Sequence, residues 1–147
     1  MSGRAPLLVV VTGMPASGKS TVAELLAERL SLPLVAKDEI KELLYETIGT
    51  GDVGFSGRLG GAAYALVFAG AARVLRAGQP VIAEANFFRG SAEPELAALP
   101  SHRLVQVHCS APLDLLVERY RSRARHPGHN DGDKIDTQND GGTTVVR

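Results

Sequence analysis

The chain has 147 residues, of which 16 are Lys or Arg and 16 are Asp or Glu, so its formal net charge is zero. This length is typical of one domain with a buried core, and the balanced charge argues against a nucleic-acid partner held by a broad basic surface. A single cysteine, Cys109, excludes an internal disulfide framework and favours a reducing, cytoplasmic setting. The apolar run near the N-terminus is too short to span a membrane and leads into glycines, so we expect neither a signal peptide nor a membrane partner.

Short apolar runs alternate along the chain with segments that have helical spacing. The runs predict strands over residues 6–12, 32–36, 80–87 and 102–110. The helical spacing predicts helices over residues 22–30, 37–49, 60–77, 91–99 and 111–125. We therefore expect one α/β domain over residues 1–147, a three-layer αβα sandwich with a central parallel sheet.

Three segments carry further predictions: the second helix, the glycine-rich segment after it and the polar C-terminal segment. In the second helix the apolar residues Ile40, Leu43, Leu44 and Ile48 share one stripe. Residues 49–61 are rich in glycine, which predicts a flexible or tightly turning loop. Residues 130–147 are polar and rich in glycine, which predicts a loop, a disordered tail or a shortened domain end.

The first strand runs into a phosphate-binding motif. The segment from Gly13 to Ser20 matches G-x-x-x-x-G-K-[ST], with a buried strand before it and an amphipathic helix after it. In such a loop backbone N–H groups hold phosphate oxygens, the lysine reaches the outer phosphates and the hydroxyl ligates Mg²⁺. We thus expect ATP and Mg²⁺ as cofactors, with Lys19 also catalytic and Ser20 on the metal. The nucleotide-binding set is Gly13, Met14, Pro15, Ala16, Ser17, Gly18, Lys19, Ser20 and Thr21, although Thr21 is equally explained as a helix-surface residue.

Glu84 is the second candidate metal group. It ends the third predicted strand, and the carboxyl edge of an open parallel sheet is where ligands bind. A carboxylate there could order the magnesium shell or contact the acceptor; the alternative is an acid that faces solvent. Asn86 and Arg89 follow on the adjoining loop and are candidate substrate contacts.

Asp38 stands where the second strand turns into a helix, at the same predicted edge of the sheet. Its carboxylate could contact the substrate and take the proton of an acceptor hydroxyl, which is the role of a catalytic base. The alternative is an N-cap for the helix that follows. One carboxylate cannot do both at once.

The last predicted helix carries arginines on two faces. Arg119 and Arg123 lie four residues apart and share a face. Arginines before a glycine-containing loop predict a lid over residues 119–135 that brings positive charge to the transferred phosphoryl group. We rank Arg123 first and Arg119 second as catalytic residues; the alternative is that these cations only complement the helix C-terminus.

With these segments in hand, the chain resembles the small P-loop kinases, in particular the zeta-toxin and chloramphenicol-phosphotransferase-like group of AAA-family ATP-binding proteins. The resemblance covers residues 7–129 and rests on "GMPASGKST", "KDEIKELL", "VIAEANF" and "LLVERYRSRARHPGH". It implies that Asp38 activates the acceptor, that Glu84 stands where relatives have Asp, and that the arginine helix leads into a lid. Relatives continue through a further helix and strand that help to hold the adenine.

These observations predict an ATP-dependent kinase that transfers the γ-phosphoryl group to a hydroxyl of a small molecule. One rival is a nucleotide-binding module with weak or no catalysis, because the polar C-terminal segment could not close a lid. Another is a polynucleotide 5′-hydroxyl kinase, against which zero net charge and few aromatic residues argue. The sequence leaves open the acceptor, the choice between ATP and GTP, and the oligomeric state.

Overall fold

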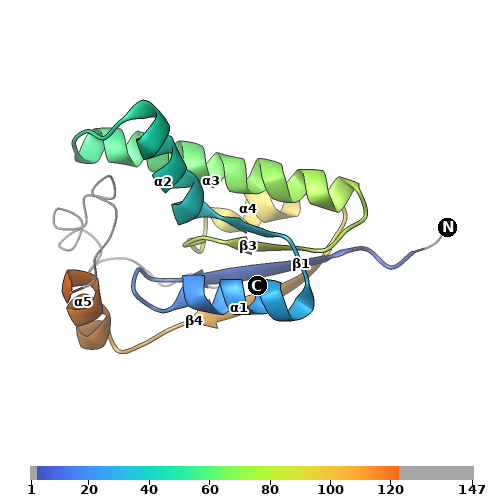
Figure 1. Cartoon of the computed structure of the whole chain (residues 1–147). Coiled ribbons are helices and arrows are strands. Elements are labelled where there is room, and N and C mark those ends of the chain that lie inside the picture. The colour runs from blue at the N-terminus through green and yellow to red at the C-terminus, as the bar shows by residue number, and fades with distance from the viewer. Residues whose placement is uncertain (1–2, 123–147) are drawn as a thin grey trace.

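The structure is a computed structural model that describes residues 3–122 (Figure 1). Arg123, most of the expected lid and the polar tail lie outside the described residues. Strands and helices alternate in the order expected from the sequence, in a single αβα arrangement. The strands are β1 (Leu7–Gly13), β2 (Leu34–Ala36), β3 (Val81–Glu84) and β4 (Arg103–Cys109). The helices are α1 (Lys19–Leu30), α2 (Lys37–Ile48), α3 (Val53–Arg76), α4 (Ala92–Ala97) and α5 (Leu113–Ser122).

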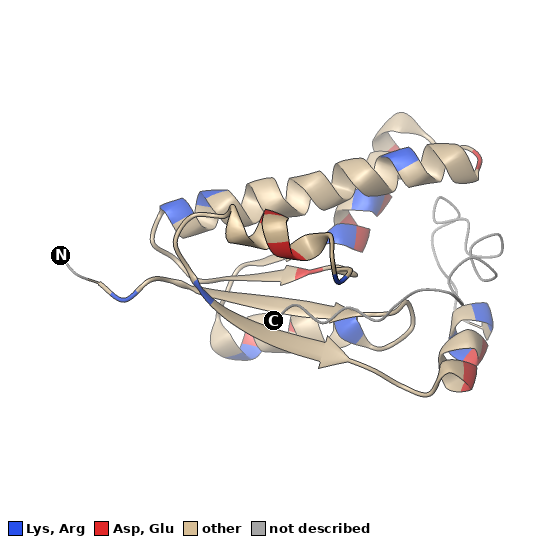
Figure 2. Cartoon of the chain, turned by 180° about the vertical axis from the view of Figure 1, so that it is seen from behind, with Lys and Arg blue, Asp and Glu red and all other residues tan. Residues whose placement is uncertain are grey.

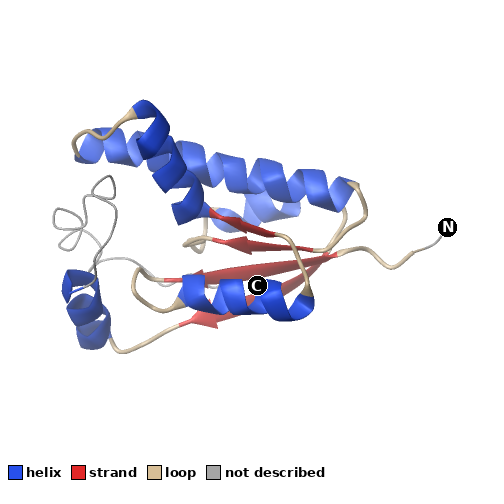
Figure 3. Ribbon diagram, in the orientation of Figure 1, coloured by secondary structure: helices blue, strands red, loops and turns tan. Residues whose placement is uncertain are grey.

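The four strands form one parallel sheet in the order β2-β3-β1-β4. β1 is central, and its residues from Leu8 to Gly13 are buried, as a continuous apolar run predicts for a strand covered on both faces. Because all strands are parallel, their carboxyl ends meet at one edge of the sheet (Figure 3). The predicted three-layer α/β fold is confirmed.

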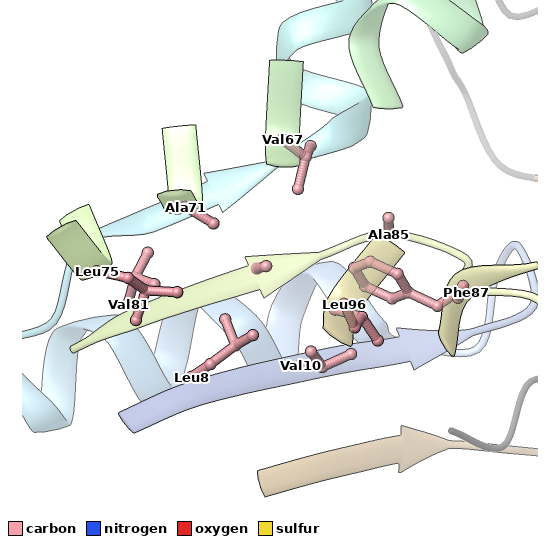
Figure 4. Close-up of a cluster of buried hydrophobic side chains, with 11 residues drawn as sticks. Leu8, Val10, Val67, Ala71, Leu75, Val81, Ala85, Phe87 and Leu96 are labelled. Carbon is pink, nitrogen blue, oxygen red and sulfur yellow. The ribbon is translucent and has the colours of Figure 1, made fainter. Parts of the chain in front are cut away.

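The two faces of the sheet support separate apolar layers. Leu8 and Val10 of β1 pack with α3, α4 and the segment after β3 in the cluster of Figure 4. Val9 and Val11 point to the opposite face and pack against α1, where Ala23 is fully buried. Successive residues of β1 thus stabilise both layers, because side chains alternate across a strand.

The prediction of a loop over residues 49–61 is wrong from Val53 onward. α3 begins at Val53 and includes four of the glycines that we assigned to the loop, at positions 54, 57, 60 and 61. Asp52 caps it, since its carboxylate accepts a hydrogen bond of 2.8 Å from the Phe55 amide. Glycine disfavours a helix interior by about 1 kcal/mol, but Leu59 and Gly60 are buried here. Tertiary packing of α3 against α2 therefore outweighs local propensity.

α2 does not bury the stripe that its apolar residues predict. Leu43 and Ile48 are 56% and 61% exposed, whereas Lys41 and Tyr45 are 4% and 2% exposed. The helix ends at Gly49, with a φ of 110°, as the sequence indicates. Its buried face is polar because α3 offers a serine and glycines at the contact, as described below.

α3 is also the one described helix that is long and apolar enough to cross a membrane by length and composition. Its buried residues pack on β3 and on the aromatic cluster of Tyr64, Phe68 and Phe87, whose ring centroids lie 5.0–5.9 Å apart. Core helices meet the same length and composition criterion. This packing accounts for the buried 39% of the apolar window of α3.

Candidate nucleotide and acceptor site

The phosphate loop connects β1 to α1 by a tight turn. The Ser17 amide donates to the Met14 carbonyl at 3.1 Å, and Ala16 adopts a φ of 65°. Gly18 has a φ of 90° and precedes the first helical residue, Lys19. No side chain caps this end of α1, which leaves its first amides and its positive dipole end to a ligand.

Gly13 is required by space at the start of the loop. A Cβ at this position would lie 2.5 Å from the Cys109 carbonyl oxygen and 2.6 Å from Ser17 Oγ. Ser17 Oγ itself is buried and has no hydrogen-bond partner within the described part of the chain. A buried hydroxyl without a partner in this part of the chain, next to uncapped helix amides, fits a bound phosphate.

Glu84 occupies the sheet edge next to this loop. It pairs in register with Val11 of β1, is 1% exposed, and its Oε1 has no partner among the described residues. Burial raises the pKa of its carboxyl to about 7. Lys19 and Lys37 oppose this shift, while the charge of Asp38 adds to it. Glu84 therefore does not face solvent, and an orphaned carboxylate beside a phosphate loop fits a divalent cation.

Asp38 lies inside α2 and not at its N-cap. The helix begins at Lys37 and its N-cap is Ala36, which makes no side-chain cap. The alternative interpretation of Asp38 as an N-cap is therefore wrong. Because its charge influences the pKa of Glu84, the two carboxylates lie in one electrostatic site. An acid in the first turn also complements the dipole of α2.

A cavity of about 400 Å³ opens at this edge between the phosphate loop, α2, α3 and the segment after β3. Lys19, Asp38, Glu84 and Asn86 line it, as expected of a shared site, together with Pro15. Figure 2 shows charged residues of α2 gathered above the end of the sheet. Three elements far apart in the sequence thus bring their polar side chains into one hollow.

Several predicted site residues do not line the cavity within the described part of the chain. From the phosphate-loop segment these are Gly13, Met14, Ala16, Ser17, Gly18, Thr21 and the predicted metal ligand Ser20. Two predicted arginine contacts are also missing from the lining. Arg89 is exposed on the loop after β3, and Arg119 is exposed on α5. From α5 it is Tyr120, 6% exposed, that lines the cavity. α5 begins at Leu113 rather than at residue 111. Arg123 lies outside the described residues.

The cavity also has lining residues that the sequence pattern did not single out. Lys41 donates a hydrogen bond of 3.0 Å to Ser56 Oγ, and the Tyr45 hydroxyl lies 2.7 Å from the same oxygen. The remaining residues of this kind that line the cavity are Lys37, Gly57, Gly60, Gly61, Tyr64, Ala85, Phe88 and Ser91. A signal was present for the lysines, since Lys37 and Lys41 are four residues apart and share a helix face.

Comparison with known proteins decides the family. A model of the AAA domain matches residues 8–141. The chain belongs to this AAA domain family. A UPF0200 protein of Thermococcus gammatolerans is 31% identical over 136 residues, which cover 82% of this chain and 68% of the relative.

Solved structures agree with the assignment of this AAA domain. A candidate kinase from Chloroflexus aurantiacus is 35% identical, with a TM-score of 0.84, and the match covers 92% of this chain and 80% of that one. A gluconokinase from Sinorhizobium meliloti is 21% identical with a TM-score of 0.55, over 92% of this chain and 76% of that one; it supports the fold alone. The AAA domain therefore has the fold of P-loop kinases, while its closer kinship to zeta toxins stays a prediction.

Proposed function

We propose that this AAA domain is an ATP-dependent kinase that phosphorylates a hydroxyl of a small molecule. The observation that carries the proposal is that Lys19, Asp38 and Glu84 line one cavity although they come from α1, α2 and β3. A nucleotide switch hydrolyses its nucleotide with water and has no acceptor hydroxyl to bind. Transfer to an acceptor requires a second carboxylate that can take the acceptor's proton. Asp38 supplies it from α2, away from the strand that carries Glu84.

Each group on the nucleotide side has a separate task. The loop amides from Gly13 onward and the Lys19 ammonium hold the phosphates, with Met14, Pro15, Ala16, Ser17 and Thr21 completing the binding segment. Ser20 and Glu84 would hold Mg²⁺, which when bound neutralises charge on the phosphates. A divalent ion would favour the charged form of the Glu84 carboxyl, which burial disfavours.

On the acceptor side Asp38 takes the proton. The acceptor oxygen forms a bond to the γ-phosphorus while the bond from that phosphorus to the β-bridging oxygen breaks, which leaves ADP. The proton of the acceptor hydroxyl passes to the Asp38 carboxylate. Asn86 lines the cavity and is available to orient the acceptor. Arg119, Arg123 and Arg89 stay proposed contacts, in which the arginines of the last helix would offset charge on the phosphoryl group.

A test of this proposal combines γ-labelled ATP, Mg²⁺ and a panel of sugars, sugar acids, nucleosides, aminoglycosides, amphenicols and a 5′-hydroxyl oligonucleotide. We expect transfer to a small molecule, and a loss of at least roughly 100-fold in Lys19→Ala, the scale of one lost transition-state cation or donor. Transfer in Lys19→Ala at the parent rate would overturn the phosphate-loop assignment. Transfer only to the oligonucleotide would favour a polynucleotide kinase, and ATP binding without any transfer would favour a binding module.

The base is tested by Asp38→Asn, which keeps the shape of the side chain. We expect kcat to fall by roughly 100-fold or more while the affinity for ATP is unchanged. Asp114→Asn is the matched control, because Asp114 also lies in the first turn of a helix but is exposed on α5. Full turnover in Asp38→Asn would show that Asp38 is structural.

A further inference from the structure

The segment that follows β3 presents a row of alternate residues to the cavity. Glu84, Asn86 and Phe88 line the cavity. Phe87, between the last two, is fully buried in the core cluster of Figure 4, and Ala85 belongs to that cluster while also bordering the cavity. Such alternation is typical of an extended chain. Phe88 is therefore the third cavity residue of a row that begins at the proposed metal group.

Phe88 combines an exposed ring with a fixed backbone. The residue is 46% exposed, and its ring contacts no other aromatic ring within residues 3–122. Its carbonyl accepts hydrogen bonds from the amides of Ser91 and Ala92, at 3.2 and 2.9 Å, and from the Ser91 hydroxyl at 3.2 Å. The backbone before it is held by the bond from the Phe87 amide to Thr12. Only the side chain of Phe88 has to be ordered when a ligand binds, which lowers the entropy lost on binding.

Two more aromatic residues line the cavity from other elements. Tyr64 of α3 packs against Phe68 and Phe87, with ring centroids 5.0 and 5.9 Å away. Its hydroxyl donates a hydrogen bond to Glu95 of α4, so the side chain is held at both ends. Tyr120 of α5 is 6% exposed. The chain has four Phe, three Tyr and no Trp, and three of these residues line this one cavity.

The cavity has room for a ring in addition to a reacting hydroxyl. Its volume is about 400 Å³, whereas an apolar cavity of roughly 150 Å³ already holds a benzene molecule. Four residues of extended chain span at most about 14 Å, which limits the distance between the backbones of Glu84 and Phe88. The ring of Phe88 thus lies within the length of a small molecule from the proposed metal group, beyond Asn86.

An exposed ring in a cavity wall favours an aromatic ligand over a polyol. A flat ring would remove apolar surface of Phe88 from water. Aromatic rings also attract one another in offset-stacked or edge-to-face arrangements. A polyol would instead bring hydroxyl groups against the ring, where a hydroxyl without a hydrogen-bond partner is unfavourable. The wall at Phe88 therefore discriminates between these two kinds of acceptor.

We propose that Phe88 is a specificity residue and that the acceptor is an alcohol with an aromatic ring. The ring packs on Phe88 in the cavity that Tyr64 and Tyr120 also line, and the reacting hydroxyl lies toward Asp38. This inference rests on the kinase function proposed above. It adds that the reacting hydroxyl and an aromatic ring belong to the same small molecule.

The first experiment compares pairs of acceptors of which only one member has an aromatic ring. The pairs are phenyl β-glucoside with methyl β-glucoside, phenylserine with threonine, and uridine with methyl β-riboside. We expect the aromatic member of at least one pair to be phosphorylated with a higher kcat/KM. Members without a ring that react as well as their aromatic partners in every pair would overturn the aromatic subsite and leave the kinase standing.

The second experiment changes Phe88 itself. Phe88→Ala should raise the KM for the aromatic acceptor by roughly 5- to 30-fold, the effect of one lost aromatic contact and its apolar area. The kcat and the KM for ATP should stay near the parent values, because the contact involves a part of the acceptor that does not react. Phe88→Tyr keeps a ring and should restore the KM of the parent.

Leu66→Ala is the matched control for Phe88→Ala. Leu66 is 47% exposed, close to the value for Phe88, but it does not line the cavity, so its removal should leave every KM unchanged. A parent-like KM of Phe88→Ala for the aromatic acceptor would overturn the role of Phe88. A rise in the KM for ATP alone would overturn it too, since Phe88 would then contact the nucleotide and not the acceptor.

If no member of any pair is phosphorylated, binding decides. The protein with Mg²⁺ and a non-hydrolysable ATP analogue is titrated with both members of each pair, while the amide signal of Ser91 is followed by NMR. A saturable shift with an aromatic member alone, lost in Phe88→Ala, would support the aromatic subsite even where the kinase proposal fails. No saturable shift, or equal shifts with both members of every pair, would overturn it.

Discussion

The hydroxyl of Thr12 accepts a hydrogen bond of 3.0 Å from the backbone amide of Phe87, across 75 positions of the chain. Both residues are fully buried. The bond joins the end of β1, where the phosphate loop begins, to the segment that carries Asn86 and Phe88 into the cavity. This bond and the hydrogen bond of 3.2 Å that the Ala85 amide donates to the Val11 carbonyl therefore tie the start of the phosphate loop to the segment after β3.

Thr12→Val should remove the hydrogen bond between Thr12 and Phe87 without changing the shape of the side chain. A buried amide of Phe87 would lose its partner, which costs about 1–3 kcal/mol. Urea unfolding followed by circular dichroism measures the change. Thr12→Ser is the control, since it keeps the hydroxyl; if the Thr12→Val variant proves as stable as the parent, the bond does not contribute to stability.

Glu84→Gln should change how stability depends on pH. The folded carboxyl has its pKa raised from 4.5 to about 7, so between these values the folded chain binds more protons than the unfolded chain. The free energy of unfolding of the parent must then fall as pH rises through this window. The amide of Glu84→Gln does not titrate, so the variant does not lose stability in this way. Relative to the parent, its free energy of unfolding should rise by up to roughly 3 kcal/mol between pH 4 and pH 8.

The measurement is urea unfolding of both proteins without nucleotide or metal at the two pH values. Glu28→Gln is a matched control because Glu28 is exposed on α1. An equal difference between the Glu84→Gln variant and the parent at both pH values would contradict the raised pKa. With Mg²⁺ and ATP present the parent should be the more stable of the two proteins, since only the parent has the Glu84 carboxylate to bind the cation.

Gly13→Ala should weaken nucleotide binding. The new methyl group would lie 2.5 Å from a backbone oxygen, so the loop or the end of β4 must move, at a cost of about 1–3 kcal/mol typical of overpacking. Calorimetric titration with Mg²⁺ and ATP reports the loss. Gly57→Ala meets no atom within 4 Å and should bind ATP like the parent; equal affinity in both variants would show that the loop tolerates the methyl group.

Asp52→Ala should destabilise the start of α3. The side chain satisfies the Phe55 amide, and the loss of such a cap costs about 0.5–2 kcal/mol. Thermal unfolding measures the shift, and Asp52→Asn should retain most of the stability because an amide oxygen also accepts this bond. A parent-like melting temperature for Asp52→Ala would show that α3 does not depend on its cap.

Local sequence was sufficient for the order of elements and for the phosphate loop. The motif from Gly13 to Ser20 needs no distant residue, because its turn, its glycines and its helix start are consecutive. The strands could be found because the parallel sheet is covered on both faces and its runs are continuously apolar. The start of α3 was missed because its glycines predict a loop. The local signal for a helix, the cap residue Asp52, was not used, and the packing of α3 on α2 is not a local signal.

The sequence by itself therefore determined an α/β domain with a phosphate loop, and placed Asp38 and Glu84 at one edge of a parallel sheet. Only the tertiary structure decided that Asp38 is not a cap, that Glu84 is buried, and that Lys37 and Lys41 line the cavity. Which face of a helix is buried depends on the partner helix. Ile40 of the predicted α2 stripe packs on the core, but Leu43 and Ile48 are exposed, while Lys41 and Tyr45 are buried instead. Contacts between segments far apart in the sequence arise from tertiary packing, which a local pattern does not encode.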